Sequence, residues 1–217
     1  SIVPDRNHKT IETARYLDLL GIHYSIEDLQ QPLHRNDGNR DPGLIIFGPG
    51  SGELESHKRW PKEKYARLAS VLTSQNGYRI EILGTPSEIE ICESIAKESG
   101  SSRVVSLAGK LSISESFERL KNAGLVVANC NGLAHMAAAV NTPVVGIYGP
   151  TDPSHTGPLT KQLNVVSLGL KCSPCYRKGY IEGCGNPICM KDIEVAQVHN
   201  AVLAAISKTG RRKPESW

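Results

Sequence analysis

The sequence lacks any apolar run long enough to cross a lipid bilayer. Its longest stretch without Asp, Glu, Lys or Arg covers residues 122–151, and Asn, His and Pro interrupt it. Because a spanning helix needs about 20 mostly apolar residues, this stretch is predicted to be the buried centre of a soluble sheet. No secretory signal is recognisable at the N-terminus. Since the first residue is Ser, we expect a processed N-terminus or a piece of a longer chain.

An excess of charge of either sign is missing as well. The 217 residues include 25 Lys and Arg against 22 Asp and Glu, for a net charge of +3. Proteins that bind nucleic acid usually concentrate basic residues in a stripe, so nucleic acid is not an expected partner. Apolar residues make up 39% and charged residues 22%, which is typical of a chain that builds a globular core. No internal repeat or low-complexity tract is visible.

Short apolar runs alternate with amphipathic stretches from about residue 41 onward. A polar connector at 30–42 precedes them, and a short amphipathic helix at 10–20 precedes the connector. Alternation of this kind predicts an α/β fold with a Rossmann-like, doubly wound parallel sheet. The expected strands are 43–47, 79–83, 104–107, 125–128, 143–148 and 163–167. The expected helices are 61–72, 86–97, 112–121, 133–140 and a last one from Asp192 to 206.

Ligands of open parallel sheets bind beyond the carboxyl ends of the strands, so the loops there are the candidate sites. The first loop, residues 48–52, is GPGSG and is followed by Lys58. Small residues allow main-chain N–H groups to approach an anion, and a Lys adds a point charge. No GK[ST] follows, so this is not a Walker A loop. A flexible turn with solvated basic residues is the alternative interpretation.

The second loop, Asn129-Cys130-Asn131-Gly132, ends a strand and begins a helix. The N-terminus of that helix favours phosphate, because its first N–H groups are free and the helix dipole adds partial positive charge. His135 lies one turn into the helix and is either a phosphate contact or a structural histidine. A third loop, residues 149–153, is either one wall of the cleft or a rigid turn.

Five pieces in this order resemble glycosyltransferase family 9, the ADP-heptose:lipopolysaccharide heptosyltransferases. They are KRWP with YARLA (58–61, 65–69), LGTP (83–86), LAGKLS (107–112), GLAHMAAA (132–139) and GIYGPTDP (146–153). The resemblance implies a GT-B architecture, of which this chain is similar to the C-terminal half. Residues 1–40 would then be the end of the N-terminal domain and the linker, and 41–217 the nucleotide-sugar-binding domain.

The resemblance also implies roles for individual residues. Ser51 and Lys58 would contact the donor phosphates, while Gly132 and Asn131 would offer backbone N–H groups to the diphosphate with support from His135. Glu88 would hold the ribose or adenosine side, and Leu111 would pack on the base. From the residues alone, Glu88 is equally a helix-capping residue and Leu111 a core residue. The catalytic Asp, the general base of the family, is expected in the other half of the architecture, so the catalytic residue of this chain stays unknown.

One position departs from the family pattern. The family usually carries Asp followed by Ser or Thr before this Gly, whereas this chain has Cys130 and Asn131. A thiol accepts hydrogen bonds from sugar hydroxyls poorly compared with a carboxylate. We therefore expect an altered contact to the sugar of the donor.

Four of the six Cys fall within eighteen residues, as C-x2-C-x8-C-x4-C: Cys172, Cys175, Cys184 and Cys189. Four thiolates suit a structural zinc, and iron is an alternative, since some relatives of these transferases carry a four-Cys iron finger. Free buried thiols or disulfides are the other interpretations. Lys171, Arg177 and Lys178 flank the cluster and either face an anionic acceptor or lipid head groups or form solvated surface.

The expected function is therefore that of a glycosyltransferase donor domain that binds ADP-heptose or a similar nucleotide sugar. It would serve inverting transfer, without a required cofactor, to a lipid-linked or saccharide acceptor of the lipopolysaccharide type. A non-catalytic nucleotide-binding or interaction module with a Cys-rich metal loop is the alternative. The expected location is the cytoplasm, with peripheral contact to the inner membrane as an option.

Overall fold

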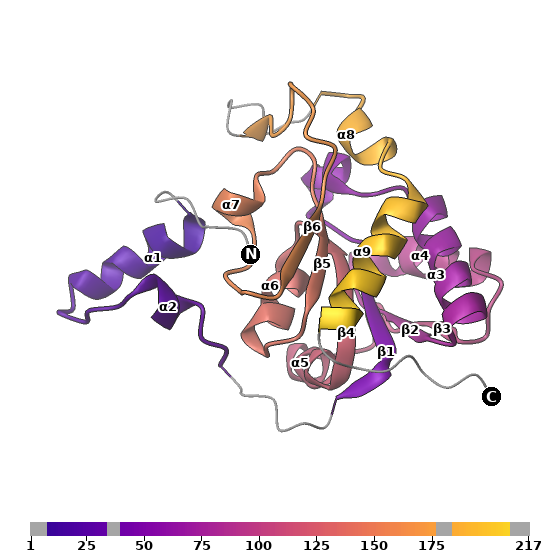
Figure 1. Ribbon diagram of the computed structural model, residues 1–217, viewed down its shortest axis with the longest axis horizontal. Coiled ribbons are helices and arrows are strands. Elements are labelled where there is room, and N and C mark those ends of the chain that lie inside the picture. Colours follow the sequence, from indigo (N-terminus) through magenta and orange to yellow (C-terminus); the bar gives the residue numbers. More distant parts are fainter. Residues whose placement is uncertain (1–7, 34–39, 177–183, 209–217) are drawn as a thin grey trace.

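A six-stranded parallel sheet forms the centre of the computed structural model, which describes residues 8–33, 40–176 and 184–208. The strand order is β3-β2-β1-β4-β5-β6 (Figure 1). This is the order of a Rossmann fold, so the predicted fold class is confirmed. The strands are β1 (Asp41–Gly48), β2 (Arg79–Ile82), β3 (Val104–Ser106), β4 (Ala123–Asn129), β5 (Val144–Ile147) and β6 (Leu163–Val166).

Helices cover both faces of the sheet (Figure 1). One face packs against α3 (Lys62–Asn76), α4 (Ile89–Glu98) and α9 (Val195–Lys208), and the other packs against α5 (Ile113–Asn122) and α6 (Gly132–Ala139). Side chains alternate across a strand, and Ile45 and Phe47 of β1 join one core while Leu44 and Ile46 join the other. Burial on both faces explains why the strands are continuous apolar runs.

The expected elements are present, and their boundaries agree to within three residues except at the end of α3, which runs to Asn76 instead of 72. Asp192 was expected to begin the last helix, but it ends the short α8 (Ile188–Lys191) instead. The last helix begins three residues later, where the N–H of Glu194 donates to Oε1 of Gln197 at 2.8 Å. Ile193 between them is fully buried, so packing of this side chain fixes a break that an acidic residue alone does not reveal.

Four short elements were not expected from the sequence. They are α2 (Ile26–Leu29), the 3₁₀ segment η1 (Glu53–Lys58), α7 (Pro153–Thr156) and α8. The 3₁₀ segment η2 (Pro86–Glu88) forms the first turn of the helix that was expected at 86–97. Such short segments carry no periodic apolar pattern. Turn-forming residues produce them, so they cannot be predicted from the spacing of apolar residues.

The N-terminal segment packs beside α6 and α7 (Figure 1). Helix α1 (Lys9–Asp18) follows His8, whose Nε2 lies 2.8 Å from the carbonyl oxygen of Gly157. The N–H of Leu33 donates to the carbonyl of Ala139 at 2.8 Å. None of the helices in the described ranges combines the length and the apolar character needed to cross a membrane.

The order of the strands places two loops side by side. Strands β1 and β4 are neighbours, with Gly48 opposite Ala128 in register. The chain winds outward in one direction from β1 and in the other direction from β4, so this is the switch point of the sheet. The loops that leave the carboxyl ends of β1 and β4 therefore flank the crevice where such folds bind ligands.

Candidate functional site

A cavity of about 560 Å³ opens at the carboxyl ends of β1 and β4. Five of the eight predicted site residues line it: Ser51, Glu88, Leu111, Asn131 and Gly132. The other three, Lys58, Cys130 and His135, do not line it, although Lys58 is paired with Glu55, which does. The cavity thus brings together predicted site residues that lie up to 81 positions apart in the sequence.

The glycines of the first loop allow close packing around the cavity. A Cβ atom at Gly50 would lie 1.7 Å from Oε1 of Glu88, and one at Gly48 would lie 2.6 Å from a methyl carbon of Leu133. No side chain fits at either position without displacing a residue of the site. The GPGSG sequence is therefore required by the approach of η2 and α6 to β1.

Hydrogen bonds from Asn129 and Asn131 join the loop after β4 to the loop after β1. Nδ2 of Asn131 donates to the carbonyl oxygens of Gly48 and Gly50, each at 3.0 Å, while its Oδ1 accepts from the N–H of Ala134 at 3.2 Å. The buried Asn129 donates to the carbonyl of Pro49 at 2.6 Å. The side chain of Asn131 is thus committed to protein contacts, and its predicted contribution to a ligand is left to its main chain.

Helix α6 points its N-terminus at the cavity. Asn131 caps the helix, and Gly132 is its first residue and lines the cavity. The first N–H groups of a helix have no partner inside the helix, and they carry part of the positive end of its dipole. A Cβ at Gly132 would meet nothing within 4 Å, which leaves the approach to these amides open.

Glu88 makes the capping contact and also lies at the cavity, where its predicted contact with a ribose stays a prediction. Its Oε2 accepts from the N–H of Thr85 at 2.8 Å, which is the capping contact. The residue is only 9% exposed and nevertheless lines the cavity. Leu111, Leu133 and Met136 also line the cavity, and all three pack against the core beside α5 and α6. The cavity therefore has a carboxylate at one place and apolar side chains at another.

Ser51 forms hydrogen bonds with the carbonyl of Glu55 and with the Arg59 guanidinium. Its hydroxyl donates to the carbonyl oxygen of Glu55 at 2.8 Å and accepts from Nε of Arg59 at 3.0 Å. A second Arg59 nitrogen donates to the Ser51 carbonyl at 3.3 Å. Arg59 was not among the predicted site residues, although it stands next to Lys58 in the motif that drew attention to this loop.

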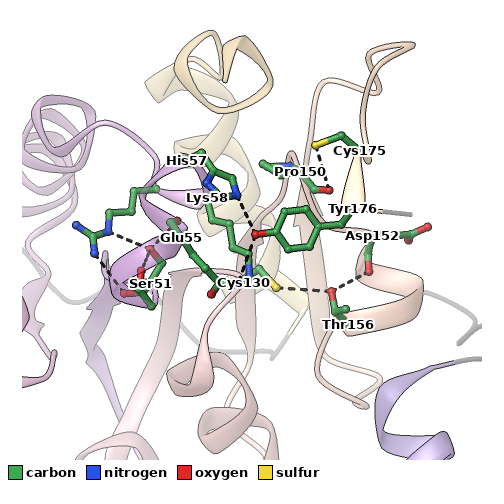
Figure 2. A network of polar contacts seen from close by, with 12 residues as sticks. Ser51, Glu55, His57, Lys58, Cys130, Pro150, Asp152, Thr156, Cys175 and Tyr176 are labelled. Carbon is green, nitrogen blue, oxygen red and sulfur yellow. Dashed lines mark hydrogen bonds and ion pairs between the residues drawn. The ribbon is translucent and has the colours of Figure 1, made fainter. Parts of the chain in front are cut away.

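Lys58 lies in a cluster of polar side chains (Figure 2). Its ammonium forms an ion pair with Glu55 and lies 4.8 Å from the centre of the Tyr176 ring. The Tyr176 hydroxyl donates to Oε1 of Glu55 at 3.3 Å and lies 2.8 Å from Nε2 of His57. Desolvation, and then the positive charge of Lys58, lower the pKa of His57, and Glu55 opposes them. Sequence reasoning missed Tyr176, which comes from a segment more than a hundred residues away.

Cys130 and His135 both interact with Thr156, the last residue of α7. The Cys130 sulfur is 3.6 Å from the hydroxyl of Thr156. A dashed line marks this contact in Figure 2. The His135 ring interacts with the main chain of Thr156, which raises its pKa. Desolvation is the larger influence and, together with the neighbouring His8, it lowers the pKa of His135 below 6.5. His135 is therefore favoured in its neutral form.

The four clustered cysteines are free thiols in different surroundings. Cys172 and Cys184 are exposed, the Cys175 sulfur lies 3.9 Å from the carbonyl of Pro150, and Cys189 is buried. Within the described ranges, no three His, Cys, Asp or Glu side chains are grouped to hold a metal ion. The described side chains thus give the predicted zinc or iron no support, and it stays a prediction for metal analysis. Arg177 and Lys178 lie outside the described residues.

Comparison with known proteins places this site in a family. Residues 12–185 match the model of glycosyltransferase family 9 (heptosyltransferase). Lipooligosaccharide heptosyltransferase 2 of Haemophilus influenzae is 38% identical over 128 residues, which are 58% of this chain and 36% of that protein. Lipopolysaccharide heptosyltransferase 2 of Escherichia coli is 29% identical over 188 residues, which are 76% of this chain and 53% of that protein.

A solved structure gives the same result. The structure of E. coli ADP-heptose lps heptosyltransferase II superposes with a TM-score of 0.66 at 27% identity. The match covers 81% of this chain and 49% of that chain. The chain thus spans about half the length of this structure and about half or less of the curated relatives named above.

Proposed function

Because the chain belongs to glycosyltransferase family 9, we propose that residues 41–217 are the donor-binding domain of a heptosyltransferase with ADP-heptose as its donor. One observation carries the proposal. The cavity at the switch point joins an apolar wall, a buried carboxylate and the N-terminus of α6 in a single lined space. A nucleoside diphosphate sugar needs these three features for its base, its ribose and its diphosphate.

The nucleoside would occupy the part of the cavity between η2 and α5. Leu111 and Met136 offer apolar surface to an adenine ring. The Oε1 atom of Glu88 faces Gly50 at the lining, while Oε2 is engaged by Thr85. A carboxylate oxygen accepts hydrogen bonds from ribose hydroxyls, so Glu88 is proposed to select a nucleotide with an intact ribose.

The diphosphate would lie against the loop after β1 and the first turn of α6. Main-chain N–H groups at Asn131 and Gly132 supply donors, Ser51 supplies a hydroxyl and Lys58 supplies the compensating charge. In the proposed inverting transfer, a carboxylate outside this domain deprotonates the acceptor hydroxyl. That oxygen then forms a bond to the anomeric carbon as the bond to the diphosphate breaks. The α6 amides, Lys58 and His135 stabilise the charge that develops on the departing diphosphate.

The remaining parts of the reaction are assigned to the other half of a GT-B enzyme. We place the general base and the site for a lipopolysaccharide-type acceptor there, with residues 1–40 as the end of that half and the linker. The chain spans about half of its relatives, which supports this division. Transfer would take place on the cytoplasmic side of the inner membrane, in peripheral contact with the lipid-linked acceptor.

Titration calorimetry of the chain with ADP, GDP and UDP tests the proposal. We expect ADP to bind with the highest affinity and with one molecule per chain. Addition of EDTA should leave the affinity unchanged, since the diphosphate is held by protein groups in this proposal and no cofactor takes part. A chain that remains folded but binds none of the three nucleotides would contradict it.

A further inference from the structure

The segment after β6 carries Cys172 and Cys175, and its Tyr176 contacts Glu55, which lines the cavity, from a distant part of the chain. Its main chain is fastened to the loop after β5. The N–H of Tyr176 donates to the carbonyl of Pro150 at 3.0 Å, and the hydroxyl of Ser173 donates to the carbonyl of Gly149. The position of the Tyr176 side chain is therefore fixed by backbone contacts on the opposite side of the switch point from η1.

The Tyr176 ring lies over the ammonium of Lys58, with 4.8 Å between the nitrogen and the ring centre (Figure 2). A lysine side chain carries its charge at the end of a flexible four-carbon chain. The groups around the ammonium therefore determine where the charge lies. The Lys58 side chain is largely enclosed, because only 10% of it is exposed, compared with 38% for the Glu55 side chain. In such an enclosed place the attraction between a cation and an aromatic face is stronger than at the surface.

The Tyr176 hydroxyl hydrogen-bonds to Glu55, the carboxylate that would compete with a bound diphosphate for the Lys58 ammonium. It donates to Oε1 of Glu55, the same oxygen that pairs with Lys58. Any diphosphate that recruits Lys58 has to compete with Glu55 for its charge. The Tyr176 hydroxyl, which itself lies 2.8 Å from Nε2 of His57, keeps the carboxylate partnered when the lysine turns to a new anion.

We infer that Tyr176 is a positioning residue of the donor site, which holds the Lys58 ammonium at the diphosphate through its ring and steadies Glu55 through its hydroxyl. The inference rests on the proposed function, because it takes the diphosphate as the partner of Lys58. It assigns the Cys-rich segment a part in donor binding that requires no metal.

A double-mutant cycle tests this assignment, with ADP affinity measured by titration calorimetry. Tyr176→Leu removes ring and hydroxyl and should weaken ADP binding about three- to thirtyfold, the range expected for a partly to fully desolvated cation–π contact. Tyr176→Phe keeps the ring and should retain most of the affinity. In a Lys58→Met background, Tyr176→Leu should have almost no further effect, because its action passes through the lysine.

The controls separate this role from a purely structural one. Tyr16→Leu removes an exposed ring on α1 and should change nothing. If Tyr176→Leu does not fold, as judged by its melting temperature, Tyr176→Met replaces it as the ring-free variant of similar length. Equal losses in Tyr176→Phe and Tyr176→Leu, or a Tyr176→Leu loss that persists without Lys58, would overturn the inference.

The two proposals fail differently. If the unmodified chain binds no ADP, the proposed function is contradicted and the inference falls with it. If the chain binds ADP and Lys58→Met weakens that binding, while Tyr176→Leu leaves it unchanged, only the inference is wrong.

Discussion

The main-chain N–H of Gly132 is the donor on which the proposed diphosphate site depends most directly. Gly132→Pro removes this one hydrogen. Proline is tolerated at the first position of a helix, and the extended backbone of Asn131, with φ −148° and ψ 174°, suits the residue before a proline. We expect titration calorimetry to show ADP binding weakened about ten- to a hundredfold, the loss of a hydrogen bond to a charged group.

The matched control for this change is Gly132→Ala, which keeps the N–H. A Cβ at this position meets nothing within 4 Å, so the helix and the affinity should both be preserved. Equal affinities for the proline and alanine variants would show that this amide does not touch the ligand.

Cys130 stands where the resemblance to the family leads us to expect Asp, and the structure places its sulfur beside the hydroxyl of Thr156. We predict that Cys130→Asp tightens binding of ADP-heptose by about tenfold or more, because a carboxylate accepts hydrogen bonds from sugar hydroxyls where a thiol does not. ADP alone, which lacks the sugar, should bind as before. Calorimetry that shows no gain for ADP-heptose, or the same gain for ADP, would reject the prediction.

At this scale the sequence predicts residues that belong to one loop and misses those that reach it from elsewhere. Ser51, Asn131 and Gly132 were found because small or polar residues at strand ends indicate an anion site. Tyr176 was not, because its contact with Lys58 spans 118 positions and leaves no periodic signal. The hydrogen bonds from the Asn131 side chain to the loop after β1 were also not predictable. They form only because the folded sheet brings the two loops together.

Among the elements, the loop after β1 and helix α6 are coupled through one side chain. Asn131→Ala removes the cap of α6 and both hydrogen bonds to the β1 loop. Since a cap contributes about 1 kcal/mol and each neutral hydrogen bond a similar amount, the free energy of unfolding should fall by about 2–3 kcal/mol. Urea denaturation measures this loss.

The control for that variant is Asn131→Asp, which keeps an oxygen for the cap but turns the two donors into an acceptor. We expect both Asn131→Asp and Asn131→Ala to weaken ADP binding to a similar extent. Both variants lose the two hydrogen bonds that hold the loop carrying Ser51. If Asn131→Asp binds ADP normally, the two elements are not coupled in this way.

The desolvated surroundings of His135 on α6 make stability depend on pH. The folded chain disfavours protonation of His135, whose pKa lies below the ordinary 6.5 through desolvation and the nearby His8, against the opposing Thr156 main chain. Below pH 6.5 the unfolded chain therefore binds more protons, so stability falls as the pH drops from 6.5 toward the folded pKa. Urea midpoints at pH 7.5 and 5.5 should differ less in His135→Gln than in the unmodified chain. An equal difference would exclude His135 as a source of the effect.

Elements with a strong periodic pattern were predictable, and those set by tertiary packing were not. Strand β1 shows why, because Ile45 and Phe47 face one core while Leu44 and Ile46 face the other, and such a run indicates a buried parallel strand. Asp192 shows the limit. An acidic residue before an apolar run resembles a helix start, yet the burial of Ile193 delays the helix to Val195.

For the whole molecule, the proposed function separates donor binding from transfer. The chain spans about half of the heptosyltransferases that it resembles, and the general base is proposed to lie in the other half. We predict that the 217-residue chain binds ADP but transfers no heptose. A fusion to the N-terminal half of the H. influenzae relative should transfer heptose to a lipopolysaccharide core acceptor. Lys58→Met in that fusion should lower the rate about a hundredfold, the usual effect of removing one preorganised charge-stabilising group. Heptose transfer by the isolated chain, followed through ADP release, would instead place the base within these residues.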